Sequence, residues 1–191
     1  MMVEYFDSHF NIASVMRVLL TSDYFQSDEA FYARVKAPIE SVVGTARLAG
    51  SYNEPTLNIH SLWSQTNFMG QGLLSPPTVE GWHEGTEWID SGALVERVNF
   101  VSNQLSNSQN PGIHFMIQTI LDRAQTPLTP EKAVDDCLDL IGPIEVEPDT
   151  YGGLMEFAYN FVKHSHSKEK EKDLLANLFG MIGATREYQL A

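Results

Sequence analysis

Apolar residues recur along most of the chain at intervals of three and four, the spacing that places them on one face of an α-helix. The pattern stops at residues typical of helix ends: a proline in the first turn, a polar cap before it, or a glycine after the last turn. The sequence predicts helices at 12–20, 38–49, 57–69, 90–105, 111–121, 130–141, 150–162 and 174–182, with a short helical turn in 27–35.

Each predicted helix has one apolar face that we expect to pack against the rest of the protein. Sustained strand alternation is missing, and residues 144–147 are too short to build a sheet. The sequence therefore predicts an all-α fold of about eight amphipathic helices. The residues expected to face inward are Ile12, Val15, Met16, Leu19, Leu20, Ile39, Val42, Val43, Ala46, Ile59, Leu62, Trp63, Thr66, Leu94, Val98, Val101, Leu105, Ile113, Met116, Ile117, Ile120, Leu121, Val134, Cys137, Leu138, Ile141, Leu154, Phe157, Ala158, Phe161, Val162, Leu174, Leu175, Leu178, Phe179 and Ile182.

The helical pattern is interrupted in residues 70–92, where glycine, proline and tryptophan dominate. Glycines stand at 70, 72, 81, 85 and 92, Pro76 and Pro77 lie between them, and Trp82 and Trp88 follow. So many glycines and prolines exclude a regular helix. Two tryptophans close together favour burial over disorder, because their rings carry a large apolar area. We therefore expect a long ordered loop.

This loop has two interpretations. In the first, Trp82 and Trp88 present flat faces to a sugar or another organic ring, and His83, Glu84 and Glu87 supply polar contacts. In the second, the tryptophans plug the core and the loop is a structural joint. The glycines fit either role, since both need unusual backbone angles.

Two polar residues on the next predicted helix extend the candidate site. Arg97 is flanked by apolar positions and lies near the edge of the buried face. Its planar fork of donors could hold loop carbonyls, or it could bind an anionic ligand. The candidate ligand-binding residues are therefore Trp82, His83, Glu84, Trp88, Arg97 and Asn99.

Composition and charge narrow the classes of partner. The chain of 191 residues is 43% hydrophobic with a formal net charge of -13, values that suit a globular protein with a core. Nucleic acid is excluded as an expected partner, because binding phosphates needs a basic patch, and the cluster at 168–172 contains its own glutamates. From the sequence we expect no membrane span and no signal peptide.

Local motifs for metals or catalysis are missing from the sequence. Cys137 is the single cysteine and lies in an apolar stripe, which suits a buried thiol. His164 and His166 point in different directions on a helix, without further zinc ligands nearby. The acids at 135–149 lack an EF-hand pattern. We expect no metal and no cofactor. An enzyme stays open, because carboxylates distant in sequence leave no local signature, although no motif argues for one.

One segment resembles the hallmark of the bacterial DUF1800 family, which reads approximately M-G-Q-x-L-x-x-P-P-x-V-x-G-W-x-x-G-x-x-W-(I/L)-x-(S/T)-x-x-L-x-x-R-x-N-F. Residues 69–101 read MGQGLLSPPTVEGWHEGTEWIDSGALVERVNFV. Upstream, VMRVLLTSDYF and RVKAPIESVVGTARLAG resemble the preceding helices of the family, and the closing TREYQLA resembles its terminal PEFQL element. The resemblance is close over 10–105 and looser over 106–191. His83 and Glu84 depart from the Pro-Gly-Gly that usually follows the first tryptophan.

The resemblance implies a helical domain, typical of exported bacterial proteins, with no established reaction and no catalytic residues to transfer. Members of the family are longer, so the chain resembles a C-terminal portion of one. We expect residues 1–105 to form a motif-bearing half with the 70–92 loop. Residues 106–191 should form a C-terminal helical bundle packed on it as one domain.

Two functions follow from these observations. The first is a non-enzymatic helical binding or assembly module, whose partner is another protein, the missing N-terminal portion of the parent chain, or a small molecule. The second is part of a hydrolase-like or redox enzyme whose active site is completed by that missing portion. The sequence does not decide the ligand, the oligomeric state or the cellular location.

Overall fold

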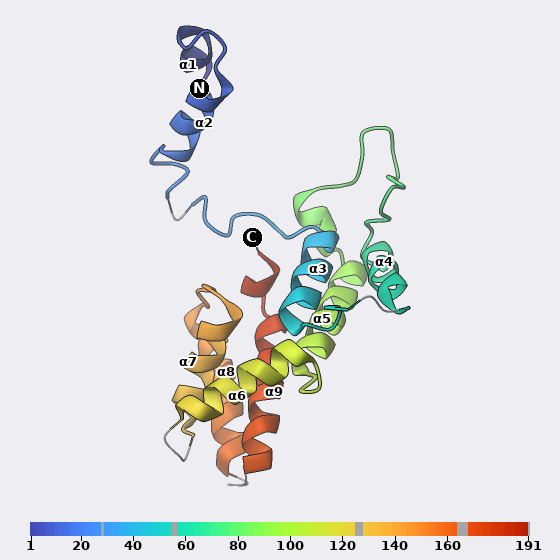
Figure 1. Cartoon of the computed structure of the whole chain (residues 1–191), viewed down its shortest axis with the longest axis vertical. Helices are drawn as coiled ribbons and strands as arrows, with labels where there is room; N and C mark the ends of the chain where they lie inside the picture. The colour runs from blue at the N-terminus through green and yellow to red at the C-terminus, as the bar shows by residue number, and fades with distance from the viewer. Residues whose placement is uncertain (28, 55–56, 125–127, 164–167, 191) are drawn as a thin grey trace. The chain divides into compact units, whose positions relative to one another are not determined.

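The computed structural model describes residues 1–27, 29–54, 57–124, 128–163 and 168–190. Over these residues the regular structure is helical, with an isolated bridge but no strand, which confirms the predicted all-α class (Figure 1). No helix in the described ranges is long and apolar enough to cross a membrane. Two compact units are present, one holding residues 1–34 with 190 and the other residues 35–189.

The helices of the first unit are α1 (Met2–Asp7) and α2 (Ile12–Leu20). Those of the second unit are α3 (Pro38–Ala49), α4 (Ile59–Phe68), η1 (Gly85–Ile89), α5 (Ser91–Ser106), α6 (Pro111–Arg123), α7 (Pro130–Ile141), α8 (Pro148–Lys163), α9 (Lys168–Ala184) and η2 (Glu187–Gln189). The boundary expected between 105 and 106 falls inside the second unit, and the division into two halves stays a prediction. His164 and His166 lie outside the described residues.

Helix ends follow the capping residues of the sequence. α2 begins after Asn11, whose side chain accepts hydrogen bonds from the backbone N–H groups of Ala13 and Ser14. α3 begins at Pro38 and is followed by Gly50, which has a φ of 69°. Glycine adopts this left-handed conformation without steric penalty, so Gly50 closes the helix.

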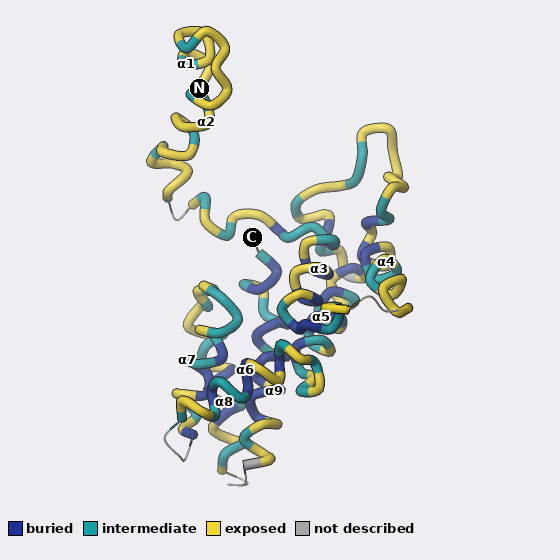
Figure 2. Tube along the Cα trace, in the orientation of Figure 1, coloured by how far each residue is buried: buried dark blue, intermediate teal, exposed yellow. Residues whose placement is uncertain are grey.

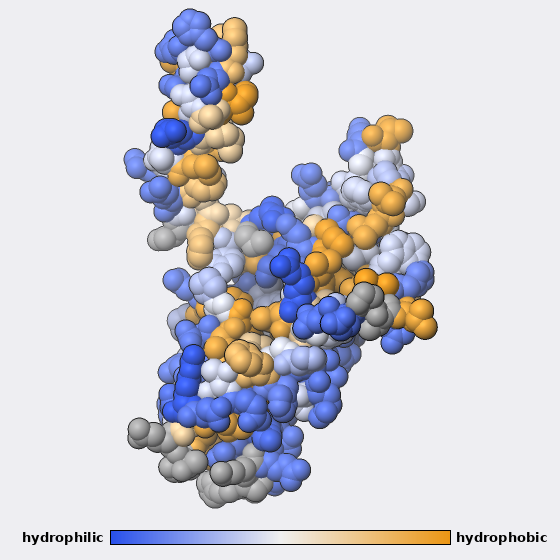
Figure 3. All heavy atoms as spheres, in the orientation of Figure 1, coloured by the Kyte–Doolittle hydropathy of each residue, from blue (hydrophilic) through white to orange (hydrophobic). Residues whose placement is uncertain are grey.

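Within the first unit, the apolar face of α2 is left exposed. Ile12, Met16 and Leu20 are exposed, and neither α1 nor α2 contains a buried residue (Figure 2). Figure 3 accordingly shows hydrophobic residues on the surface of this unit. The prediction that these three residues face inward is wrong, because a unit of this size is too small to build a core. Within 27–35, residues 29–32 lie in turns, and the backbone N–H of Ala30 donates to the carbonyl of Ser27 (3.0 Å), but the described part contains no helix.

The core of the second unit is built on α5 and α9, whose backbones approach closely. A Cβ added to Gly183 of α9 would lie 2.5 Å from Cγ1 of Val101 and 2.8 Å from Cδ1 of Leu105 on α5. Glycine at this position therefore permits the contact. The inward faces predicted for the last four helices are confirmed at Ile113, Ile117, Ile120, Val134, Cys137, Leu154, Ala158, Leu174, Leu175, Leu178, Phe179 and Ile182.

The predicted inward faces of α3, α4 and α5 are wrong at four positions: Val43, Ile59, Trp63 and Leu94 are exposed. α3 turns a face with small and polar side chains inward instead, which lets it lie close to its neighbours, and α4 buries little of its surface. Apolar spacing does not distinguish these faces, because it reports hydrophobicity and not which side meets a neighbour. The residues buried on α3 and α4 are Pro38, Ser41, Val42, Thr45, Ala46, Ala49 and Thr66.

Candidate functional site

The loop between α4 and α5 is anchored at its base. Trp88, on η1, is 5% exposed. Trp82 is half-buried, and its Nε1–H donates a hydrogen bond to the carbonyl oxygen of Gly72 (3.1 Å). Gln71 is buried just after α4, and its Oε1 accepts a hydrogen bond from the N–H of Ile39 in the first turn of α3 (2.8 Å). This bond satisfies an amide that has no partner within the helix, and it ties the loop to α3.

The tip of the loop is exposed and apolar. Relative to a fully exposed reference residue, the accessible area of Leu74 is 97% and that of Val79 is 106%. Leu74 also has a φ of 63°, in the left-handed region that residues other than glycine rarely adopt. A turn follows, in which the N–H of Gly81 donates to the carbonyl of Thr78 (3.2 Å). The loop therefore joins a fixed base to an apolar tip that the described residues leave uncovered.

The polar candidates of the loop lie in solvent. His83 Nδ1 contacts a carboxylate oxygen of Glu87, and the two side chains are 58% and 61% exposed. Glu84 is exposed as well. Solvent competes for each of these groups, so the His83–Glu87 pair contributes little to stability and forms no enclosed acid–base site.

Arg97 is fully buried and acts as a hydrogen-bond centre. Its Nε donates to Oε1 of Gln189 (3.2 Å), and its Nη2 donates to the carbonyl of Lys36 (2.6 Å). Burial lowers the pKa of Arg97 to about 10, and Glu40 opposes that shift, so the guanidinium stays charged near neutral pH. Its Nη1 has no hydrogen-bond partner among the described residues. Asn99 lies on the exposed side of α5.

Lys36 and Tyr188 complete the contacts around Arg97. The Nζ of Lys36 donates to the carbonyl of Tyr188 (2.5 Å) and lies 4.4 Å from the centre of the Tyr188 ring. The backbone N–H of Lys36 donates to the carbonyl of Gln189 (2.9 Å). Burial, and then the neighbouring Arg97, lower the pKa of Lys36, because both disfavour its charged form. The Tyr188 hydroxyl is hydrogen-bonded to Thr45 of α3 (3.0 Å).

These residues, Lys36, Arg97, Tyr188 and Gln189, form what we call the Arg97 network. It joins three stretches that resemble the family in the sequence: RVKAPIE, VERVNF and TREYQL. Lys36, Tyr188 and Gln189 were not among the predicted site residues, and the resemblance of TREYQLA to the terminal element is the signal that could have found them. The donors of Arg97 and Lys36 bond to carbonyl and amide oxygens, so the network holds η2 against α3 and α5.

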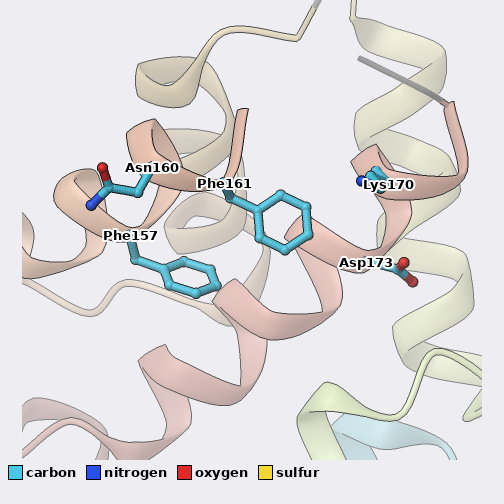
Figure 4. A pocket seen from close by; sticks show the side chains of 5 residues that line it. All are labelled: Phe157, Asn160, Phe161, Lys170 and Asp173. Carbon is cyan, nitrogen blue, oxygen red and sulfur yellow. The ribbon is translucent and has the colours of Figure 1, made fainter. Parts of the chain in front are cut away.

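The described residues of the second unit line hollows at two places away from the 70–92 loop. One, of about 380 Å³, is lined by Phe157, Asn160, Phe161, Lys170 and Asp173 between α8 and α9 (Figure 4). The other, of about 720 Å³, runs along α6. Neither is lined by residues of the 70–92 loop, and the ligand-binding role of the six candidate residues stays a prediction. Within the described ranges, no three His, Cys, Asp or Glu residues gather as a metal site.

The resemblance to one family extends along almost the whole chain. Neither a curated protein nor a solved structure matches the sequence. A family model described as "Protein of unknown function (DUF1800)" matches residues 1–190, including the part after residue 105 where the resemblance is looser. The chain therefore belongs to the DUF1800 family.

Proposed function

We propose that this chain is a helical binding or assembly module without a catalytic centre of its own, and that the tip of the 70–92 loop contacts a partner protein. The observation that carries the proposal is the nearly complete exposure of Leu74 and Val79 on a loop whose base is fixed by Trp82 and Trp88. Exposed apolar side chains on an ordered segment are typical of surfaces that another protein covers.

The anchored base supports this role through entropy. Ordering a mobile loop on binding costs free energy, and a loop already held by its tryptophans avoids much of that loss. Leu74 adds a second indication, because its left-handed backbone is unfavourable for a leucine and gains no burial in return. Such strain concentrates at functional sites, where the surrounding structure maintains it.

The shape of the tip favours a protein over a small molecule. Small-molecule sites are concave and enclose most of the ligand. Leu74 and Val79 instead project from the loop, in the way that apolar anchors enter a pocket on a partner. The exposed Glu84 and His83, with the half-buried Trp82, would then lie at the polar margin of the contact.

Photo-crosslinking in cells tests the proposal. A benzophenone amino acid at position 79 should capture one discrete partner, because the side chain at that position lies in the proposed contact. The same probe at position 131, an exposed glutamate in the first turn of α7, should not capture that partner. Capture of the same partner from both positions, or none from position 79, would count against the tip as the contact surface.

A further inference from the structure

The larger hollow is a groove, and one face of α6 forms one of its walls. His114, Ile117, Gln118, Leu121 and Asp122 line it at spacings of three and four. At a rise of 1.5 Å per residue, the stretch from 114 to 122 is about 12 Å long, or roughly two turns of helix. The groove is therefore elongated, and its length suits a segment of chain better than a single ion.

The floor of the groove is apolar. Ile117 and Leu128 close it from below and are 1% and 4% exposed, so the apolar surface open to a ligand comes mainly from the half-buried Leu121. Ala124 extends this surface toward the end of α6. An apolar stripe of a ligand would lose contact with water on this floor, which is the main source of favourable free energy in helix-in-groove binding.

Carboxylates stand on both sides of that floor. Asp122 projects from α6, and Glu169, Glu171 and Asp173 line the groove from the first turns of α9. Among the described residues that line the groove, Lys172 is the one lysine, so four carboxylates there are balanced by one ammonium group. Acids near a helix N-terminus also favour the helix itself. The acid on α6 lies near the other helix end, where that explanation does not apply.

We propose that the groove between α6 and α9 binds a basic amphipathic helix of a partner protein. The apolar stripe of that helix would rest on Leu121 and Ala124, and its lysine or arginine side chains would reach the carboxylates on either side. The apolar floor and the carboxylates on both sides of it complement the apolar stripe and the cationic side chains of such a helix. This surface is separate from the loop tip, so the two proposals stand or fall independently.

Fluorescence anisotropy with the full chain tests this proposal. The probe is a labelled peptide of leucine and lysine in an amphipathic pattern, about 15 residues long so that it can form a helix. Its matched counterpart replaces every lysine with glutamate. We expect the leucine–lysine peptide to bind and become helical, with an affinity that falls as salt is added, and the leucine–glutamate peptide to bind at least about tenfold more weakly.

Two triple variants separate the groove from the overall charge of the chain. The variant D122N/E171Q/D173N should weaken binding of the leucine–lysine peptide at least about tenfold. The control E131Q/E145Q/E156Q removes the same charge from exposed sites that do not line the groove, and should change binding less than about twofold. Gln118→Arg, which adds a cation to the α6 wall and removes no carboxylate, should weaken binding in the same direction. Circular dichroism verifies that each variant is folded.

Three results would overturn the proposal. Equal losses in the two triple variants would mean that the net charge of -13 attracts any cation without a site. Equal binding of the lysine and glutamate peptides would mean that charge plays no part. Failure of the leucine–lysine peptide to bind the wild-type chain would remove the groove as a site for such a helix.

Discussion

Replacing Arg97 with methionine tests whether the Arg97 network holds α5, the helix that follows the 70–92 loop, to η2. Methionine has a shorter side chain of similar volume, so it fills most of the space, but it donates no hydrogen bond. Gln189 Oε1 and the Lys36 carbonyl would each lose the donor that now reaches them at 3.2 and 2.6 Å. Because Arg97 is fully buried, water does not readily replace those donors.

The expected loss follows from the groups left without partners. A buried acceptor without a donor costs about 1–3 kcal/mol, so two of them cost roughly 2–6 kcal/mol. Removing the buried cation offsets part of this loss of stability, because the charged guanidinium no longer has to be desolvated beside Lys36. We therefore expect Arg97→Met to lower the free energy of unfolding by about 2–4 kcal/mol.

Urea unfolding followed by circular dichroism measures this loss. The matched control is Arg123→Met, since Arg123 is half exposed and lies 3.7 Å from its partner carboxylate on Asp139. Such a surface pair contributes at most about 1 kcal/mol. In a double-mutant cycle, Arg97→Met and Gln189→Ala should show a coupling of at least about 0.5 kcal/mol, because they share one hydrogen bond. Unchanged stability of Arg97→Met, together with zero coupling, would refute the network as a joint.

Three further predictions concern packing. Trp88→Ala should lower the free energy of unfolding by about 3–5 kcal/mol, whereas Trp63→Ala, at an exposed site, should lower it by less than about 1 kcal/mol. Denaturant titrations measure both losses, and equal losses would contradict the burial of Trp88 at the base of the loop. Gly183→Ala should destabilise the protein by about 1–3 kcal/mol through overpacking, while Gly153→Ala, which has open space around it in α8, should stabilise the protein by up to about 1 kcal/mol. A shift of the melting temperature in the same direction for both variants would contradict the close approach of α9 to α5. Burial raises the pKa of the Cys137 thiol, so a disulfide reagent should label it only after unfolding, and rapid labelling of the native chain would disprove its burial.

Helix starts could be predicted because capping acts over two or three residues. Asn11 accepts from the N–H groups just after it, and the Thr129 hydroxyl accepts from Lys132 N–H in the same way. Both interactions depend only on neighbouring residues, so the sequence carries the information directly.

The partners of Arg97 could not be predicted from the sequence, because they are 61 and 92 residues away along the chain. Arg97 itself was identified through its place on an apolar face, but spacing within one helix says nothing about which distant carbonyl meets its donors. The same limit explains Ile12 and Trp63, whose apolar spacing predicted burial. Burial depends on whether another element covers that face, which the local pattern does not contain.

The affinity of the chain for the partner captured at position 79 tests the central claim, that the loop tip is the contact surface. Isothermal titration calorimetry with the purified partner compares wild type, L74S/V79S and the control Leu57→Ser, which changes another leucine that is 99% exposed. If Leu74 and Val79 are apolar anchors, L74S/V79S should weaken binding by about 30-fold or more, which corresponds to roughly 2 kcal/mol, and Leu57→Ser should leave it unchanged. Wild-type affinity in L74S/V79S would contradict the claim.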